Sequence, residues 1–150
     1  MIPSLTGSSA AGFVAGIVFG FYPYHFEHYS HLELQMMQWM PLSLLALHRF
    51  VETRAARYAI AAAVCAAAQL YSSMYYGVFF PLYAAAVLGT LLVVSRPDWR
   101  RMAPPLAAAG LIAVLLSVPL ARPYYAAAAV KGERDIPTVT YYSAGASDYF

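Results

Sequence analysis

The feature that most limits how this chain can fold is the run at residues 58–95, which contains no charged side chain. As a single α-helix this run would extend about 57 Å, nearly twice the roughly 30 Å hydrocarbon thickness of a bilayer. It therefore predicts two antiparallel helices, at about residues 58–72 and 76–94. We expect the turn at Tyr71–Gly77, because tyrosine favours the membrane–water interface and glycine permits a tight bend.

Two further stretches, residues 1–24 and 102–121, are also free of charge. Over the whole chain 61% of the residues are hydrophobic and 11% are charged, whereas soluble domains average about 25% charged residues. A small water-soluble domain cannot bury so much apolar surface. The sequence predicts an all-α fold, a polytopic transmembrane helix bundle with about five membrane segments. We place these segments at about 9–24, 32–50, 58–72, 76–94 and 102–121, followed by a loop or tail at 122–150.

Prolines predict where two of these segments end and where a third is kinked. Pro23 should end the first, because proline lacks the backbone N–H that an α-helix needs. Pro41 falls inside the second and predicts a kink there. The fifth segment should end near Pro119, just before Arg122 and its neighbouring proline.

The arginines predict the orientation of the segments. They form two clusters, at residues 49–57 and 96–101, and the double crossing between the clusters places both on one side of the membrane. Because basic residues accumulate on the cytoplasmic side, we expect that side to be cytoplasmic. The loop His25–Gln35, the turn at Tyr71–Gly77 and the tail at 122–150 should then meet on the outer side.

The densest group of ionisable side chains follows the first predicted segment and allows three interpretations. Its histidines and carboxylates are typical of a hydrated loop at the membrane surface. They also fit a substrate-binding rim that includes His28 and His31, with Glu27 or Glu33 as a catalytic carboxylate. The third interpretation, a metal site from His25, His28 and His31, is disfavoured. Histidines three residues apart lie about 60° apart around a helix and converge poorly on one ion, so we predict no metal site.

Tyrosines in the expected turn form a second candidate site. Tyr75 and Tyr76 carry hydroxyl groups that can hydrogen-bond sugar hydroxyls or phosphate oxygens. The same residues are typical of the aromatic belt of a membrane protein. Both interpretations stay open.

Several chemical classes are excluded by what the sequence lacks. No basic run with interleaved aromatic residues indicates a nucleic-acid partner. No phosphate-binding loop, nucleophile elbow or dinucleotide fingerprint is present. Cys65 is the one cysteine, so the chain has no internal disulfide. The expected partners are the lipid bilayer and a lipid-linked substrate.

Several short motifs in and between the apolar segments are similar to part of a known protein superfamily. These motifs are Leu5-Thr6-Gly7-Ser8-Ser9-Ala10-Ala11, Phe21-Tyr22-Pro23-Tyr24, His28, His31-Leu32, Gln38-Trp39-Met40-Pro41-Leu42, Leu47-His48-Arg49 and Tyr142-Ser143-Ala144-Gly145-Ala146-Ser147-Asp148-Tyr149. They resemble bacterial membrane proteins of the GT-C glycosyltransferase superfamily, and among these the YfhO-like and mannosyltransferase-like proteins. The resemblance covers nearly the whole chain and implies a partial GT-C-like fold.

The resemblance implies an inverting transfer of a sugar from a polyprenyl-phosphate donor at the outer face of the bacterial inner membrane. Such proteins have ten or more spans, so the chain is expected to be a fragment. Their catalytic carboxylate lies upstream of the matched segment, so the resemblance assigns that role to no residue of this chain. His28, His31 and Glu33 match only the general position of the loop. Arg122, Lys131 and Arg134 are the outer-side cations available to face the donor phosphate. The alternative, that they are surface charges of a solvated loop, stays open. The cofactor stays open, and a divalent metal in the full-length enzyme is compatible with the resemblance.

Two other functions compete with transfer. A transporter segment should carry ionisable residues within its spans and broken helices at the midplane, whereas the charges here cluster at the predicted ends. A non-catalytic membrane subunit would need no convergence of the outer polar elements. A transferase is distinguished from such a subunit by whether the open reading frame extends upstream into another outer loop that bears an aspartate or a glutamate.

Overall fold

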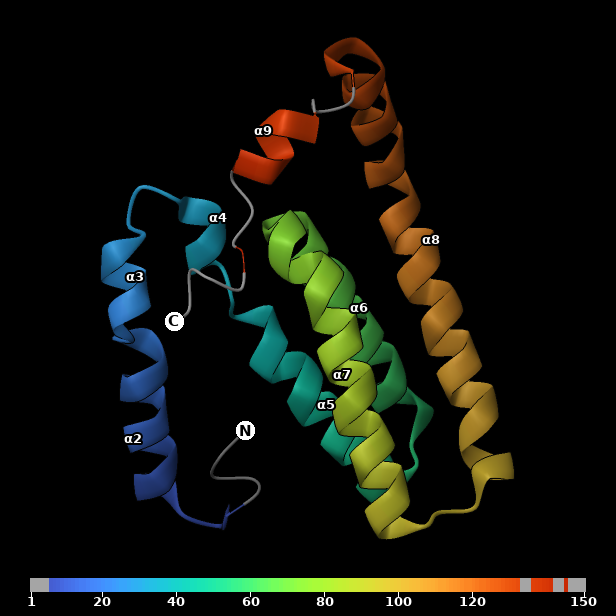
Figure 1. Cartoon of the computed structure of the whole chain (residues 1–150). Coiled ribbons are helices and arrows are strands. Elements are labelled where there is room, and N and C mark those ends of the chain that lie inside the picture. Colours follow the sequence, from blue (N-terminus) through green and yellow to red (C-terminus); the bar gives the residue numbers. More distant parts are fainter. Residues whose placement is uncertain (1–5, 133–135, 142–144, 146–150) are drawn as a thin grey trace. The chain divides into compact units, whose positions relative to one another are not determined.

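The computed structural model describes residues 6–132, 136–141 and 145, and every regular element among them is a helix. The chain divides into two compact units, residues 1–117 and 118–150, which are described separately. Within the described ranges, five helices have twelve residues or more, and three are shorter. The helices are α2 (Ser9–Gly20), α3 (Pro23–Glu27), α4 (Leu32–Gln35), α5 (Trp39–Thr53), α6 (Ala56–Ser72), α7 (Met74–Ser95), α8 (Trp99–Lys131) and α9 (Ile136–Tyr141) (Figure 1).

The predicted out-and-back hairpin is confirmed. Helices α6 and α7 lie side by side, and a single extended residue, Ser73 (φ −154°, ψ 117°), separates them. Near this turn, Leu70 of α6 lies against Gly77 of α7. At the far ends of the same helices, Ala59 and Leu92 belong to one hydrophobic cluster. The two helices are therefore antiparallel over their length (Figure 1).

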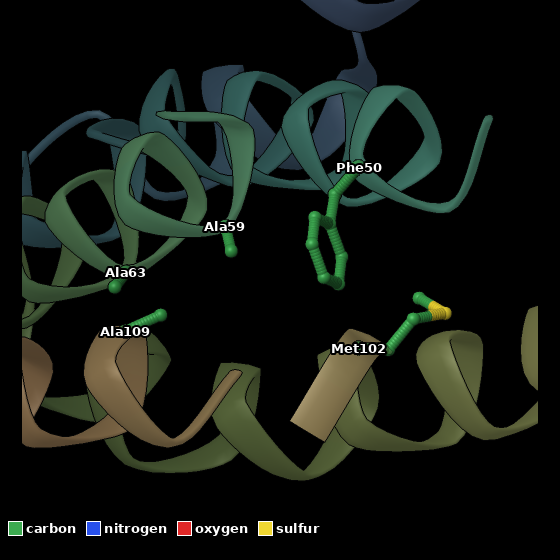
Figure 2. Close-up of a cluster of buried hydrophobic side chains, with 5 residues drawn as sticks. All are labelled: Phe50, Ala59, Ala63, Met102 and Ala109. Atoms are coloured by element: carbon green, nitrogen blue, oxygen red, sulfur yellow. The ribbon is translucent and has the colours of Figure 1, made fainter. Parts of the chain in front are cut away.

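Helices α5 and α8 extend this antiparallel array within the first unit. The end of α5 and the beginning of α8 meet in the cluster of Phe50, Ala59, Ala63, Met102 and Ala109, in which Phe50 and Met102 point toward one another (Figure 2). At the opposite end, the Tyr71 hydroxyl donates a hydrogen bond to the carbonyl oxygen of Leu116 over 2.8 Å. Four consecutive helices thus alternate in direction, as short connections between packed helices favour.

Small side chains allow these helices to approach closely. The Ser43 hydroxyl of α5 donates to the Ala62 carbonyl oxygen of α6 over 2.9 Å. Ala46 and Leu47 pack against Ala62 in a second buried cluster. A helix face of alanine and serine brings backbones into contact, as is typical of helix packing in membranes.

The first predicted segment, 9–24, is interrupted. Helix α2 ends at Gly20, and Pro23 begins a new helix instead of ending the first one. Proline suits the first helical position, where its missing N–H would have no partner in any case. The break at residues 21–22 precedes the proline.

The second predicted segment, 32–50, also divides into two helices. Helix α4 ends at Gln35 and α5 begins at Trp39, so the expected kink at Pro41 is a full interruption. In an unbroken helix Pro41 could not bond the carbonyl of residue 37 and its ring would clash with it. In the first turn of α5 neither problem arises.

The fifth predicted segment, 102–121, is longer at both ends. Helix α8 begins at Trp99 and continues past Pro119 to Lys131. The run Ala126–Ala129 beyond the prolines consists of alanine, the residue type with the highest intrinsic helix propensity. This composition favours continuation of the helix. The part of α8 beyond residue 117 belongs to the second unit.

Two helices among the described residues are long and apolar enough to cross a membrane, on length and composition alone. They are α7, Met74–Ser95, and α8 over Trp99–Val130. Helices α2, α5 and α6 have 12, 15 and 17 residues, or about 18, 22 and 26 Å. Each is shorter than the roughly 30 Å hydrocarbon layer.

Candidate functional site

Part of the predicted loop and part of the predicted turn line one hollow. It has a volume of about 380 Å³ and lies between the α3–α4 region and the beginning of α7. Its walls combine aromatic, ionisable and apolar side chains: Tyr24, His31, Glu33, Leu34, Tyr75, Tyr76 and Phe79. The 22 residues of α7 separate this hollow from Arg96 by a helix about 33 Å long. The hollow therefore lies at the end of the helix array away from the arginine clusters.

Hydrogen bonds hold the loop that forms one wall. The Gln35 side chain donates through Nε2 to the carbonyl oxygens of His25 and His28, over 3.2 and 3.3 Å. The ring of His28 stacks on Tyr24 with centroids 4.0 Å apart, and its Nδ1 lies 3.2 Å from the Tyr24 carbonyl oxygen. These contacts fix the path of the chain between α3 and α4, and with it the position of Tyr24 at the hollow.

One histidine–carboxylate pair faces the hollow. His31 Nδ1 lies 3.3 Å from Glu33 Oε1, and both side chains are about half exposed. A carboxylate hydrogen-bonded to an imidazole orients the ring. The pair is therefore able to move a proton to or from a hydroxyl group bound in the hollow.

A buried amide anchors the hollow to the helix array. Gln69 of α6 is fully buried, and its Nε2 donates to the Met36 carbonyl oxygen over 2.6 Å. This bond ties the link between α4 and α5 to the end of α6, as expected for a glutamine that bonds across helices. The Gln69 Oε1 and the Ser73 Oγ are buried without a hydrogen-bond partner among the described residues.

The structure brings together four of the predicted site residues and separates the others. His31, Glu33, Tyr75 and Tyr76 line the hollow. Glu27 is exposed outside the hollow. His28 packs behind the hollow on Tyr24.

The predicted tail belongs to the second unit, which is described separately from the unit that holds the hollow. Arg122 is an exposed residue of α8 in the second unit. Arg134 lies outside the described residues, as do the other tail residues at 133–135, 142–144 and 146–150. The predicted meeting of loop, turn and tail is therefore established only for the loop and the turn.

Three residues of the hollow were not among the predicted site residues: Tyr24, Leu34 and Phe79. Phe79 follows Tyr75 and Tyr76 at helical spacing, which places all three on neighbouring positions of α7. That spacing was the signal available in the sequence. Among the residues that the structure describes, no group of three or more histidine, cysteine or acidic side chains could hold a metal ion.

No family model, curated protein or solved structure matches the sequence.

Proposed function

We propose that the chain belongs to an integral membrane protein and that its hollow binds the head group of a lipid-linked sugar for transfer to an acceptor hydroxyl. The observation that carries this proposal is the shared hollow of His31, Glu33, Tyr75 and Tyr76. It combines a candidate proton acceptor with aromatic and hydroxyl groups of the kind that bind sugars. The resemblance to GT-C glycosyltransferases supports the choice of substrate class.

Exposed apolar helices support the membrane placement. Only 11% of the most apolar 18-residue window of α7 is buried, and only 6% of that of α8. A core helix of a soluble protein would be mostly buried. Leu82, Val93 and Val94 of α7 are each exposed by 69% or more. Exposure of this apolar surface to water is unfavourable by roughly 25 cal/mol per Å² of surface. Lipid chains would cover the surface without that free-energy cost.

The position of the hollow supports an outer-face site. It lies at the end of α7 opposite Arg96, and the basic residues are expected on the cytoplasmic side. A sugar donor with a polyprenyl tail would keep its tail in the bilayer beside the apolar helices and place its head group at this end. In such a transfer Glu33 would accept the proton of the attacking hydroxyl while the polyprenyl phosphate leaves.

The two carboxylates of the loop give a matched test of this function. In the intact protein in its native membrane, Glu33→Gln should lower sugar transfer about 100-fold or more, the usual contribution of a general base. Glu27→Gln should leave transfer close to wild type, because Glu27 lies outside the hollow. The measurement is transfer of radiolabelled sugar from a polyprenyl-phosphate donor. Equal transfer by both variants and the wild type would contradict the role of Glu33, whereas no transfer by the wild type would favour a non-catalytic membrane subunit.

A further inference from the structure

The end of the helix array away from the hollow collects the arginines of both clusters. The Phe50, Ala59 and Met102 cluster, with Leu92 packed against it, lies within four residues of each arginine-bearing segment. We call residues 49–57 and 96–101 the basic end. It holds six arginines and two carboxylates, and so an excess of positive charge from two connections that are distant in sequence.

Half of these arginines have a partner within the protein. Arg49 pairs with Glu52 over 3.0 Å, and Arg101 pairs with Asp98 over 3.4 Å. Arg57 lies over the ring of Tyr58, 4.9 Å from its centroid. Both carboxylates of the basic end are therefore already engaged.

The other three arginines have no ion pair among the described residues. Arg54, Arg96 and Arg100 are exposed, and each lies beside the shared cluster. Guanidinium groups bind phosphate oxygens through two parallel hydrogen bonds. These three side chains are free to make such bonds.

The backbone gives no reason for arginine at two of these positions. Arg54 and Arg96 end α5 and α7 in the left-handed region, with φ of 57° and 41°. Glycine adopts that conformation without strain and is the usual residue there. A positive charge near a helix C-terminus is favourable, and this gain does not depend on a ligand. What arginine adds beyond it is a guanidinium group directed to the surroundings.

We propose that the basic end binds the phosphodiester head groups of anionic phospholipids in the leaflet that it faces. The inference rests on the proposed membrane placement and adds a lipid partner to it. Clusters of basic residues next to a membrane segment attract anionic lipids. Trp99, which is 59% exposed beside Arg100, is of the residue type that accumulates at the head-group level.

Trp99 also provides the probe for this proposal. The chain has two tryptophans, so Trp39→Phe leaves Trp99 as the single fluorophore. This variant is reconstituted in phosphatidylcholine vesicles that contain brominated phosphatidylglycerol or brominated phosphatidylcholine as quencher. Quenching should show a preference of about fivefold or more for phosphatidylglycerol beside Trp99, the factor expected from one basic side chain at the surface.

Three variants separate charge from structure. The first is a triple variant that combines Arg54→Gly, Arg96→Gly and Arg100→Gln. It should bring the quenching preference for phosphatidylglycerol close to one, and its glycines keep the left-handed backbone without strain. Lysine at the same three positions should retain a preference, because it preserves the charge. Trp99→Phe leaves Trp39, at the beginning of α5 near the hollow, as a reporter that should show no preference.

Each result decides between the two proposals. Equal quenching of Trp99 by both lipids keeps the membrane placement and overturns the anionic-lipid site. No quenching by either lipid overturns the lipid site and contradicts the membrane placement of this end. A preference that disappears in inorganic phosphate, but not in chloride of equal ionic strength, assigns the arginines to free phosphate and overturns the lipid assignment.

Discussion

Leu70 and Gly77 meet where α6 and α7 leave the turn at Ser73, and a side chain at position 77 has no space there. A Cβ atom on Gly77 would lie 2.3 Å from the Leu70 Cα atom, which is backbone and cannot move aside alone. The sequence predicts this glycine for a tight bend. The structure places it inside α7, where its role is the close approach of two helices.

We therefore expect Gly77→Ala to destabilise the protein by about 2 kcal/mol, as overpacking of a helix contact does. Gly89→Ala is the matched control on the same helix, because nothing lies within 4 Å of the added Cβ. Alanine there should be neutral or slightly stabilising. The measurement is denaturant unfolding of both variants in detergent micelles. Equal stabilities would show that α6 and α7 do not meet at this point.

At the same scale, the sequence singled out four of the polar residues that line the hollow and missed Tyr24, Leu34 and Phe79. His31, Glu33, Tyr75 and Tyr76 carry groups whose chemistry is visible from residue type alone. Leu34 and Phe79 are ordinary apolar residues, and only the packing of α4 near α7 places them in the hollow. The same packing separates Glu33 from Glu27, which the sequence treats as equivalent.

At the scale of elements, the hairpin of α6 and α7 could be predicted from the length of the charge-free run alone. The interruptions within the predicted segments 9–24 and 32–50 could not. A charge-free run of twice the bilayer thickness has to turn, whatever its residues. Proline is more ambiguous, because it is compatible with the first turn of a helix and incompatible with its interior. Pro23 is the first residue of α3 and Pro41 lies in the first turn of α5, whereas Pro119 lies inside α8. The sequence alone does not distinguish these cases.

The attachment of α8 to α6 at the hollow end can be tested through a single hydroxyl. Tyr71→Phe removes the hydrogen bond to Leu116 and should reduce stability by about 0.5–1 kcal/mol, the usual range between helices in membranes. Tyr83→Phe is the control, since the hydroxyl of this exposed residue has no hydrogen bond among the described residues. Comparison of the two unfolding midpoints in one detergent measures the difference. A larger loss in Tyr83→Phe would contradict the described packing of α8.

At the scale of the first unit, charge and polarity separate along the helix array. The hollow end carries Glu27 and Glu33 and has no lysine or arginine in residues 1–48, while the basic end carries six arginines. Between them the helices expose apolar side chains. This order, with opposite polar ends and an apolar middle, is what a bilayer selects in a helical protein. Under the proposed membrane placement, this order puts one end on each side of the bilayer.

That assignment predicts the result of labelling with a membrane-impermeant thiol reagent. Cys65 is first replaced by alanine, and single cysteines are introduced at Ser30, Thr53 and Ser95, all of which are exposed. Ser73 in the turn is unsuitable, because it is only 2% exposed. In intact cells Ser30→Cys should be labelled, whereas Thr53→Cys and Ser95→Cys should react only after the membrane is permeabilised.

Other labelling patterns at positions 30, 53 and 95 would contradict different parts of the proposed topology. Labelling of positions 53 and 95 without position 30 would keep the hairpin and reverse its orientation, which would move the hollow to the cytoplasmic side and remove it from an outer-face donor. Labelling of only one of positions 53 and 95 would place the two arginine clusters on opposite sides. The second result cannot be reconciled with the antiparallel contact of α6 and α7, because Ala59 and Leu92 would then lie a bilayer apart.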